Sequence, residues 1–257
     1  MGRTLGRDEG ATVLNQDIYE LSATQKHRLG TRLRRGDRVF RYAKAVATFT
    51  KTSTLCYSYY HQDIMYAAIA AASPIGSDKI YVTVGASDGI ANDGTIAAHA
   101  LEGGHVVIFD ATANENMYFG IRDNNAAVSG GTITITLDGE LPLVTVATTY
   151  HVEVIGSPYR VGNGNPNGIR WWAGLPMRMA TTTYPYFWLQ TWGPCWVSPQ
   201  SSAGASANHG TVVARHDGSL DVQSTSGYSD AQIVGSVMSY AQDGSQGAPF
   251  VFLTIAC

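Results

Sequence analysis

Large apolar side chains are most concentrated in residues 184–197, with the sequence YPYFWLQTWGPCWV. In an extended strand both faces of this run are apolar or aromatic, with Tyr184, Tyr186, Trp188, Gln190 and Trp192 on one face and Phe187, Leu189 and Thr191 on the other. We therefore expect a strand that is covered on both sides and about which the core forms. Proline lacks a ladder donor, so Gly193-Pro194 is expected to break the strand, and the amide of Gln190 needs a hydrogen-bond partner.

Short alternating runs between turn residues continue along most of the chain. They predict strands at residues 39–46, 79–84, 104–109, 116–122, 130–137, 210–215, 220–223, 232–239 and 249–256. The last two are expected to form a terminal hairpin with a long loop. Residues 59–72 carry apolar side chains at helical spacing and form the one predicted helix, which Pro74 ends.

This pattern predicts a mostly β protein, with a β-barrel-like or sandwich-like body of short antiparallel strands, an extended N-terminal arm and little helix. Residues 1–35 have no clear apolar period, so we expect an arm that is mobile alone and lies on this body or on a neighbour. A β domain is expected over residues 36–160, and a C-terminal β subdomain packed on it over residues 161–257.

Charge adds a candidate binding site at the N-terminal end. Between Lys26 and Lys51, nine basic residues accompany one acid, Asp37, for a net charge of +8, whereas residues 52–257 have a net charge of −9. A basic segment on an acidic body predicts docking on an acidic partner, through Arg28, Arg32, Arg34 and Arg35. Nucleic acid is the competing partner, although the segment has no recognisable nucleic-acid-binding module, and a solvated basic face is the simplest alternative.

Two adjacent tryptophans, Trp171 and Trp172, are the other candidate contact residues. In a strand they face opposite sides, so one of them can be exposed as an interface anchor. The alternative is that both complete the core.

The sequence offers no supported catalytic or cofactor site. The stretch Gly85-Ala-Ser-Asp-Gly89 matches the G-x-S-x-G pattern of serine hydrolases, but a turn rather than a helix is expected after it. The seven histidines have no metal-ligand spacing, and the three cysteines are expected to be free thiols. No phosphate-binding loop is present, so we expect no enzyme, no metal and no cofactor.

Three motifs, in this order along the chain, resemble a known family. They are GDRVFRYA at residues 36–43, the run from Ile121 through Gly130-Gly131 to Leu137, and FWLQTWGP at residues 187–194. They resemble the head decoration, or cement, proteins of tailed bacteriophages, which are usually encoded beside the major capsid protein. The segment around Trp171 departs from the family pattern, which has smaller residues there.

The resemblance implies a structural virion protein that is made in the host cytoplasm and binds the outer surface of the head. Its expected partners are the major capsid protein and neighbouring copies of itself, as a dimer or trimer, without nucleic acid or membrane. A receptor-binding or glycan-binding tail or fibre module remains an alternative. A hydrolase whose site assembles from distant residues is the second alternative.

Overall fold

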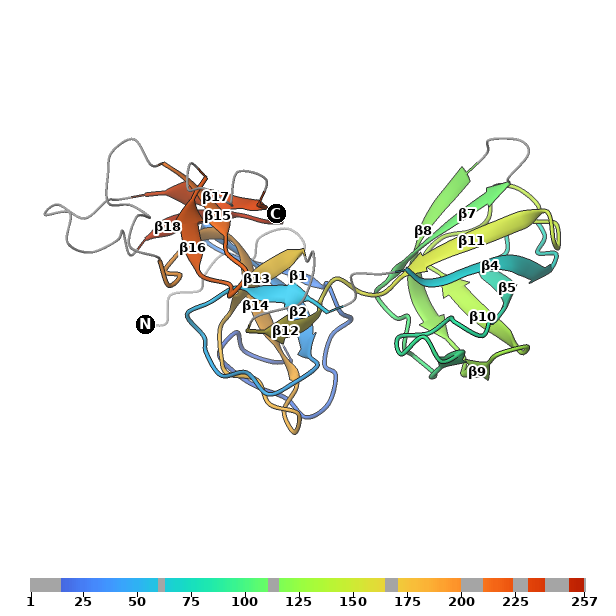
Figure 1. Cartoon of the computed structure of the whole chain (residues 1–257), viewed down its shortest axis with the longest axis horizontal. Helices are drawn as coiled ribbons and strands as arrows, with labels where there is room; N and C mark the ends of the chain where they lie inside the picture. Colours follow the sequence, from blue (N-terminus) through green and yellow to red (C-terminus); the bar gives the residue numbers. More distant parts are fainter. Residues whose placement is uncertain are drawn as a thin grey trace, which may run out of the picture. The chain divides into compact units, whose positions relative to one another are not determined.

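The computed structural model describes residues 15–59, 63–110, 116–164, 171–199, 210–223, 231–238 and 250–256. The chain forms two compact units (Figure 1): Met1–Tyr59 with Tyr159–Cys257, here called the sheet unit, and Tyr60–Pro158, here called the barrel unit. Every regular element in the described residues is a β-strand, so the prediction of a mostly β fold is confirmed.

Six antiparallel strands close the barrel, in the order β10-β5-β4-β11-β7-β8. These are β4 (Asp63–Ala71), β5 (Lys79–Thr83), β7 (His105–Asp110), β8 (Asn116–Asn124), β10 (Thr132–Leu137) and β11 (Tyr150–Ile155). Two short strands, β6 (Thr95–Ile96) and β9 (Ala127–Val128), pair beside it. A closed ring of strands leaves no unpaired edge, which explains how strands this short form a stable unit.

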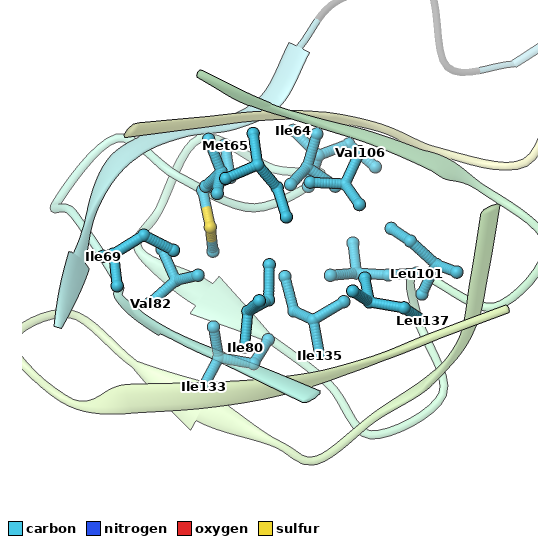
Figure 2. Close-up of a cluster of buried hydrophobic side chains, with 14 of the residues drawn as sticks. Ile64, Met65, Ile69, Ile80, Val82, Leu101, Val106, Ile133, Ile135 and Leu137 are labelled. Carbon is cyan, nitrogen blue, oxygen red and sulfur yellow. The ribbon is translucent and has the colours of Figure 1, made fainter. Parts of the chain in front are cut away.

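Aliphatic side chains fill the barrel, as Figure 2 shows. On β10 the alternation seen in the sequence places Ile133, Ile135 and Leu137 inside, and each is fully buried. The threonines between them face outward and lie opposite β5. This strand shows how a period of two assigns one face to the core and the other to the surface.

The predicted helix at residues 59–72 is wrong, because its described part is strand β4. Ile64 and Ile69 are buried in the barrel while Tyr66 is exposed, and β4 pairs with β11 and β5. The alanines of this segment fit a helical period as well as a strand period. Pairing of this segment with β11 and β5 therefore determines that it is a strand, as tertiary context commonly overrides local propensity.

The sheet unit is built on a ten-stranded sheet in the order β1-β2-β12-β3-β13-β14-β18-β17-β15-β16, with an additional β2–β14 pairing. The strands are β1 (Arg32–Arg35), β2 (Arg38–Ala45), β3 (Cys56–Ser58), β12 (Arg160–Asn163), β13 (Trp172–Pro176), β14 (Tyr186–Cys195), β15 (Thr211–Ala214), β16 (Leu220–Val222), β17 (Ile233–Val237) and β18 (Val251–Thr254). The terminal hairpin predicted from the sequence is confirmed, since β17 and β18 pair antiparallel.

Strand β14 is the centre of this unit, as its aromatic sequence predicts. It pairs with β2, β13 and β18. Trp188 packs into one cluster with Tyr42, whereas Phe187 and Leu189 pack into a second cluster. The expected cover on both faces is therefore confirmed.

The expected break at Gly193-Pro194 is wrong, because β14 continues to Cys195. Pro194 lies opposite Phe252 of β18, and the register against β2 shifts between Gln190 and Trp192. The side-chain amide of Gln190 donates to the carbonyls of Trp192, Gly193 and Pro194 at 3.2, 3.3 and 2.9 Å. This buried amide satisfies backbone acceptors around the irregularity, so the strand passes through it.

The described part of the N-terminal segment is not a separate arm. Ile18, Leu29 and Leu33 are buried in one cluster with Phe40, Tyr42 and Trp188. Residues 15–35 therefore lie on the body, which was one of the two positions expected for them. Residues 1–14 of the predicted arm lie outside the described residues.

The observed units differ from the predicted domain boundaries at residues 36 and 160. The barrel unit is an insertion between β3 and β12, which are antiparallel neighbours with Ser58 opposite Val161. Residues 36–59 belong instead with the C-terminal part of the chain, because β2 pairs with β14 over most of its length.

Candidate functional site

Three of the four predicted contact arginines lie on one β-hairpin. Strands β1 and β2 pair from Arg32 opposite Arg41 to Arg35 opposite Arg38, and the two-residue turn is Gly36-Asp37. Gly36 has φ of +58°, a conformation that hairpin turns require and that glycine adopts without strain. The fourth arginine, Arg28, precedes β1 and is exposed. We call β1, β2 as far as Arg41, and Arg28 the basic hairpin.

The basic hairpin places like charges directly opposite each other. The pairs Arg32–Arg41 and Arg35–Arg38 are cross-strand neighbours, an arrangement that costs stability by itself. One ion pair offsets this cost, since Arg35 Nη2 lies 2.9 Å from Asp17 Oδ2. The hydrogen bond from the backbone N–H of Tyr19, followed by the contact with Arg35, lowers the pKa of the Asp17 carboxyl.

Buried side chains of the hairpin pack against the core of the sheet unit. Leu33 and Phe40 are opposite each other on β1 and β2, and both are buried beside Trp188. The guanidinium of Arg38 lies 5.3 Å from the centre of the Phe40 ring, within the range of a cation–π contact. The exposed side chains of Arg28, Arg32 and Arg34 therefore stand on a fixed backbone, which lowers the entropy cost of binding a partner.

The two predicted tryptophan contacts have different positions. Trp172 is buried, its backbone N–H donates to Oε1 of Gln232 at 2.7 Å, and its ring lies edge-on to Tyr57 with the centroids 6.1 Å apart. The core therefore covers Trp172, and Trp171 is the one of the two that stays a predicted contact. Trp171 is half-buried against Tyr159, and Trp196, which the sequence analysis missed, is 43% exposed. Trp196 follows the end of β14, where alternation beyond the strand could have indicated it.

The outer wall of the barrel carries a second surface that the sequence analysis missed. Register places Tyr66, Glu153, Val107 and Tyr118 in one row across β4, β11, β7 and β8. The next row contains Ala68, His151, Phe109 and Asn116, and His105 lies in the third. We call this surface the aromatic face, made of Tyr66, His105, Val107, Phe109, Tyr118, His151 and Glu153.

The rings of the aromatic face contact one another. His105 stacks on Tyr118 with centroids 5.4 Å apart, and Phe109 stacks on His151 at 6.0 Å. Tyr66 and Tyr118 are 62% and 63% exposed, so the two outer rings are largely open to solvent. Burial lowers the pKa of His105, an effect that the nearby Asp138 carboxylate opposes. Exposed aromatic clusters of this kind commonly mark interaction sites.

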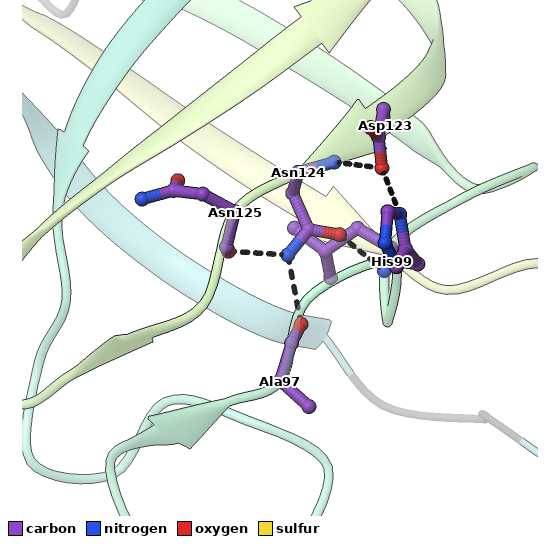
Figure 3. Close-up of polar contacts among 6 residues, drawn as sticks. Ala97, His99, Asp123, Asn124 and Asn125 are labelled. Carbon is purple, nitrogen blue, oxygen red and sulfur yellow. Dashed lines mark hydrogen bonds and ion pairs between the residues drawn. The ribbon is translucent and has the colours of Figure 1, made fainter.

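A histidine–aspartate pair on the barrel was also missed (Figure 3). His99 Nδ1 lies 2.7 Å from Asp123 Oδ1, which also accepts the N–H of Asn124 at 2.8 Å. The Asn124 amide donates to the carbonyl of Ala97 and accepts the N–H of Leu101, both at 2.9 Å. These contacts hold the loop before β7 against β8, so the pair stands in a network with a structural role.

The remaining candidate chemistry has a structural explanation. Gly85–Gly89 is a turn in which Asp88 Oδ2 accepts the N–H of Gly85 at 2.7 Å, and no helix follows it among residues 63–110. Cys56 and Cys195 are free, buried thiols, and burial raises the pKa of both, that of Cys195 to about 12. Within the described ranges, no three His, Cys, Asp or Glu side chains group as metal ligands would.

Comparison of the chain with family models, with curated proteins and with solved structures finds no match. In the part of the chain that the structure describes, no helix has the length and hydropathy needed to span a membrane.

Proposed function

We propose that this protein is a head decoration protein of a tailed bacteriophage, which binds the outside of the capsid and stabilises the lattice of the major capsid protein. The ordered motifs at residues 36–43, 121–137 and 187–194 support the proposal by their resemblance to such proteins. The structural observation that carries it is the basic hairpin, which presents Arg28, Arg32 and Arg34 on a fixed backbone.

A clamp of this kind acts by binding alone. Any protein that binds the assembled shell and not its separated subunits stabilises the shell by mass action. Arginine suits the contact, because its planar guanidinium pairs with carboxylates through two parallel hydrogen bonds. An acidic surface on the assembled particle is therefore the proposed target of the basic hairpin.

The test is thermal disruption of purified particles with and without the protein. Particles that carry the protein are expected to release their DNA at a higher temperature than stripped particles, and adding the purified protein back should restore the difference. Equal release temperatures for stripped and complete particles would remove the proposed function.

A charge variant tests the role of the hairpin within that function. Replacing Arg28, Arg32, Arg34 and Arg35 together by Gln should lower the occupancy of particles and flatten its dependence on salt. The matched control replaces Lys51, Lys79, Arg122 and Arg178 by Gln, which removes four exposed positive charges elsewhere. Equal occupancy for the hairpin variant and the control at every salt concentration would exclude the hairpin as a contact.

A further inference from the structure

The two structural units carry opposite net charges. The barrel unit, Tyr60–Pro158, contains eleven acidic and two basic residues, a net charge of −9. The rest of the chain contains nine acidic and fifteen basic residues, a net charge of +6. Two copies of such a molecule attract each other when the sheet unit of one approaches the barrel unit of the other.

The positive charge is concentrated on a specific exposed element. The basic hairpin holds Arg28, Arg32 and Arg34 exposed, and Arg35 and Arg38 beside them. Arginine and tyrosine are the residue types that most often dominate binding energy at protein interfaces. The surface that would receive this hairpin should therefore combine aromatic rings with negative charge.

The aromatic face of the barrel has this combination. Tyr66 and Tyr118 offer exposed rings at either end of a row that also contains the carboxylate of Glu153. The carboxylate of Asp138 lies beside the same face, since it accepts the N–H of Gly120 at 2.9 Å and Gly120 is opposite His105. Guanidinium groups bind both kinds of group, stacking on the rings and pairing with the carboxylates.

Two cation–π contacts of this kind already occur within the chain. Arg38 lies 5.3 Å from the ring centre of Phe40, and Lys44 Nζ lies 5.4 Å from that of Tyr186. The opposite wall of the barrel, formed by β5 and β10, offers no comparable surface. Its outward rows pair Thr132 with Thr83 and Thr134 with Tyr81, so threonine dominates there.

We propose that the basic hairpin of one copy docks on the aromatic face of the barrel of a second copy. The contact joins two different surfaces. Each copy has one basic hairpin and one aromatic face, so copies associate head to tail. This inference rests on the hairpin being a docking site, as in the proposed function, and names the next copy as the acidic partner. On a shell, such links tie neighbouring decoration proteins to one another.

The experiment uses two variants of the full chain, each with one surface blocked. The hairpin variant carries Arg32→Glu and Arg34→Glu, which leaves the ion pair between Arg35 and Asp17 in place. The barrel variant carries Tyr66→Arg and Tyr118→Arg, two positions exposed enough to accept the change without disturbing the core. Its matched control carries Thr83→Arg and Thr132→Arg, which add the same charge to the opposite wall.

Sedimentation velocity at low salt measures the association of each protein. The native chain and the threonine control are expected to associate as concentration rises, and added salt should weaken both. Each blocked variant alone should associate at least about tenfold more weakly, because like charges now meet at the contact. An equimolar mixture of the two variants should form dimers, since the intact hairpin of one meets the intact barrel of the other.

The mixture separates the proposal from its competitors. Circular dichroism first shows that each variant is folded, and absence of recovery on mixing the two folded variants then overturns the proposal. Association of the barrel variant equal to that of the native chain also overturns it. If the native chain stays monomeric while the hairpin variant loses its place on particles, the hairpin binds the capsid protein, and the proposed function survives without this contact.

Discussion

The hydroxyl of Tyr42 donates a 2.7 Å hydrogen bond to Oε1 of Gln16, across 26 positions of sequence. The amide of Gln16 donates in turn to the carbonyls of Glu20 and Tyr186 at 2.8 and 2.9 Å. The indole N–H of Trp188 donates to the carbonyl of Gln16 at 3.1 Å. One buried glutamine thus ties the N-terminal segment to the two central strands of the sheet unit, and burial raises the pKa of Tyr42 to about 12.

Removing the Tyr42 hydroxyl should destabilise the protein through this glutamine. The substitution Tyr42→Phe keeps the ring contacts but leaves Gln16 Oε1 buried without its donor, which costs about 1–3 kcal/mol. Urea denaturation should show a lower midpoint. The control Tyr184→Phe, at a position 51% exposed, should leave the midpoint unchanged. Equal midpoints for Tyr42→Phe and the native protein would show that the glutamine bond contributes nothing.

The two tryptophans of β14 should differ in what they contribute. Trp188 has no exposed area, and its ring packs edge-on against Tyr42 at 5.1 Å. Replacing it by Ala should cost roughly 3–5 kcal/mol, because a large cavity remains in the core. Trp192 is half-buried and contacts Phe252 at 5.5 Å, so its replacement by Ala should cost less. Melting temperatures of the two variants give the order, and a larger loss for Trp192→Ala would contradict the packing described here.

Acid should lower the stability of the protein through half-buried imidazoles. The ring of His27 lies 5.1 Å from Tyr42 and 5.2 Å from Trp188, and burial lowers its pKa below the ordinary value of 6.5. The unfolded chain therefore binds a proton at a higher pH than the folded chain does. Stability should be constant above about pH 6.5 and should fall as pH drops through that value towards the lowered pKa.

Denaturation midpoints between pH 8 and pH 5 measure this dependence. His27→Phe should reduce its slope, and the part that remains is expected from His105, whose pKa burial also lowers. Carboxylates such as Asp17 contribute at lower pH, because their ordinary pKa is 3.8 and the fold lowers it further. A slope that is identical in the native protein and in His27→Phe would show that His27 is not the titrating group.

Gly193 should be far less tolerant of a side chain than another glycine of similar conformation. Gly193 has φ of +90°, and a Cβ there would lie 2.1 Å from the carbonyl oxygen of Asp37. Gly130 has φ of +80° but nothing within 4 Å of the same position. Gly193→Ala should thus lose stability from both strain and overlap, whereas Gly130→Ala loses it from strain alone. Equal losses in thermal melts would mean that the approach of β14 to the hairpin turn is not tight.

Local alternation predicted much of the fold, and pairing between distant segments explains what it missed. Strand β14 was identified because aromatic and apolar side chains occupy both of its faces, and β10 because its isoleucines alternate with threonines. The alanines of β4 carry no such contrast, so their period was ambiguous. The sequence did not indicate that the barrel is an insertion. Ser58 and Val161 are separated in the sequence by the whole barrel unit and become neighbours only when β3 pairs with β12.

Of the two candidate surfaces, the sequence predicted only the one whose residues are close together along the chain. The basic hairpin is one continuous segment, so its arginines were recognised from charge alone. The aromatic face combines Tyr66, Phe109, Tyr118 and His151 from four strands, two of which, β4 and β11, had not been identified as strands. Which residues share a face of a barrel depends on its register, and register is set by the whole pattern of pairing.

The turn at Gly85–Gly89 gives the sharpest test against a catalytic role. Asp88 is 8% exposed and accepts the N–H of Gly85, while the N–H of Gly89 donates to the carbonyl of Ile64 at 2.7 Å. Ser87 between them is exposed. We expect Ser87→Ala to leave the melting temperature unchanged. We expect Asp88→Ala to cost the barrel unit about 1–3 kcal/mol, because the partly buried N–H of Gly85 loses its hydrogen bond to a carboxylate.

A pair of assays on the same two variants decides whether this turn is structural. Thermal melts should rank Asp88→Ala well below Ser87→Ala, because only the aspartate holds the turn closed. A nucleophile elbow would instead show the effect of Ser87→Ala in an activity assay, since its serine stands at the start of a helix and attacks substrate. Here the chain continues through further turns to β6 instead. If a hydrolytic activity were measured on an ester substrate and Ser87→Ala abolished it with the melting temperature intact, the protein would be an enzyme and the non-catalytic function proposed here would be wrong.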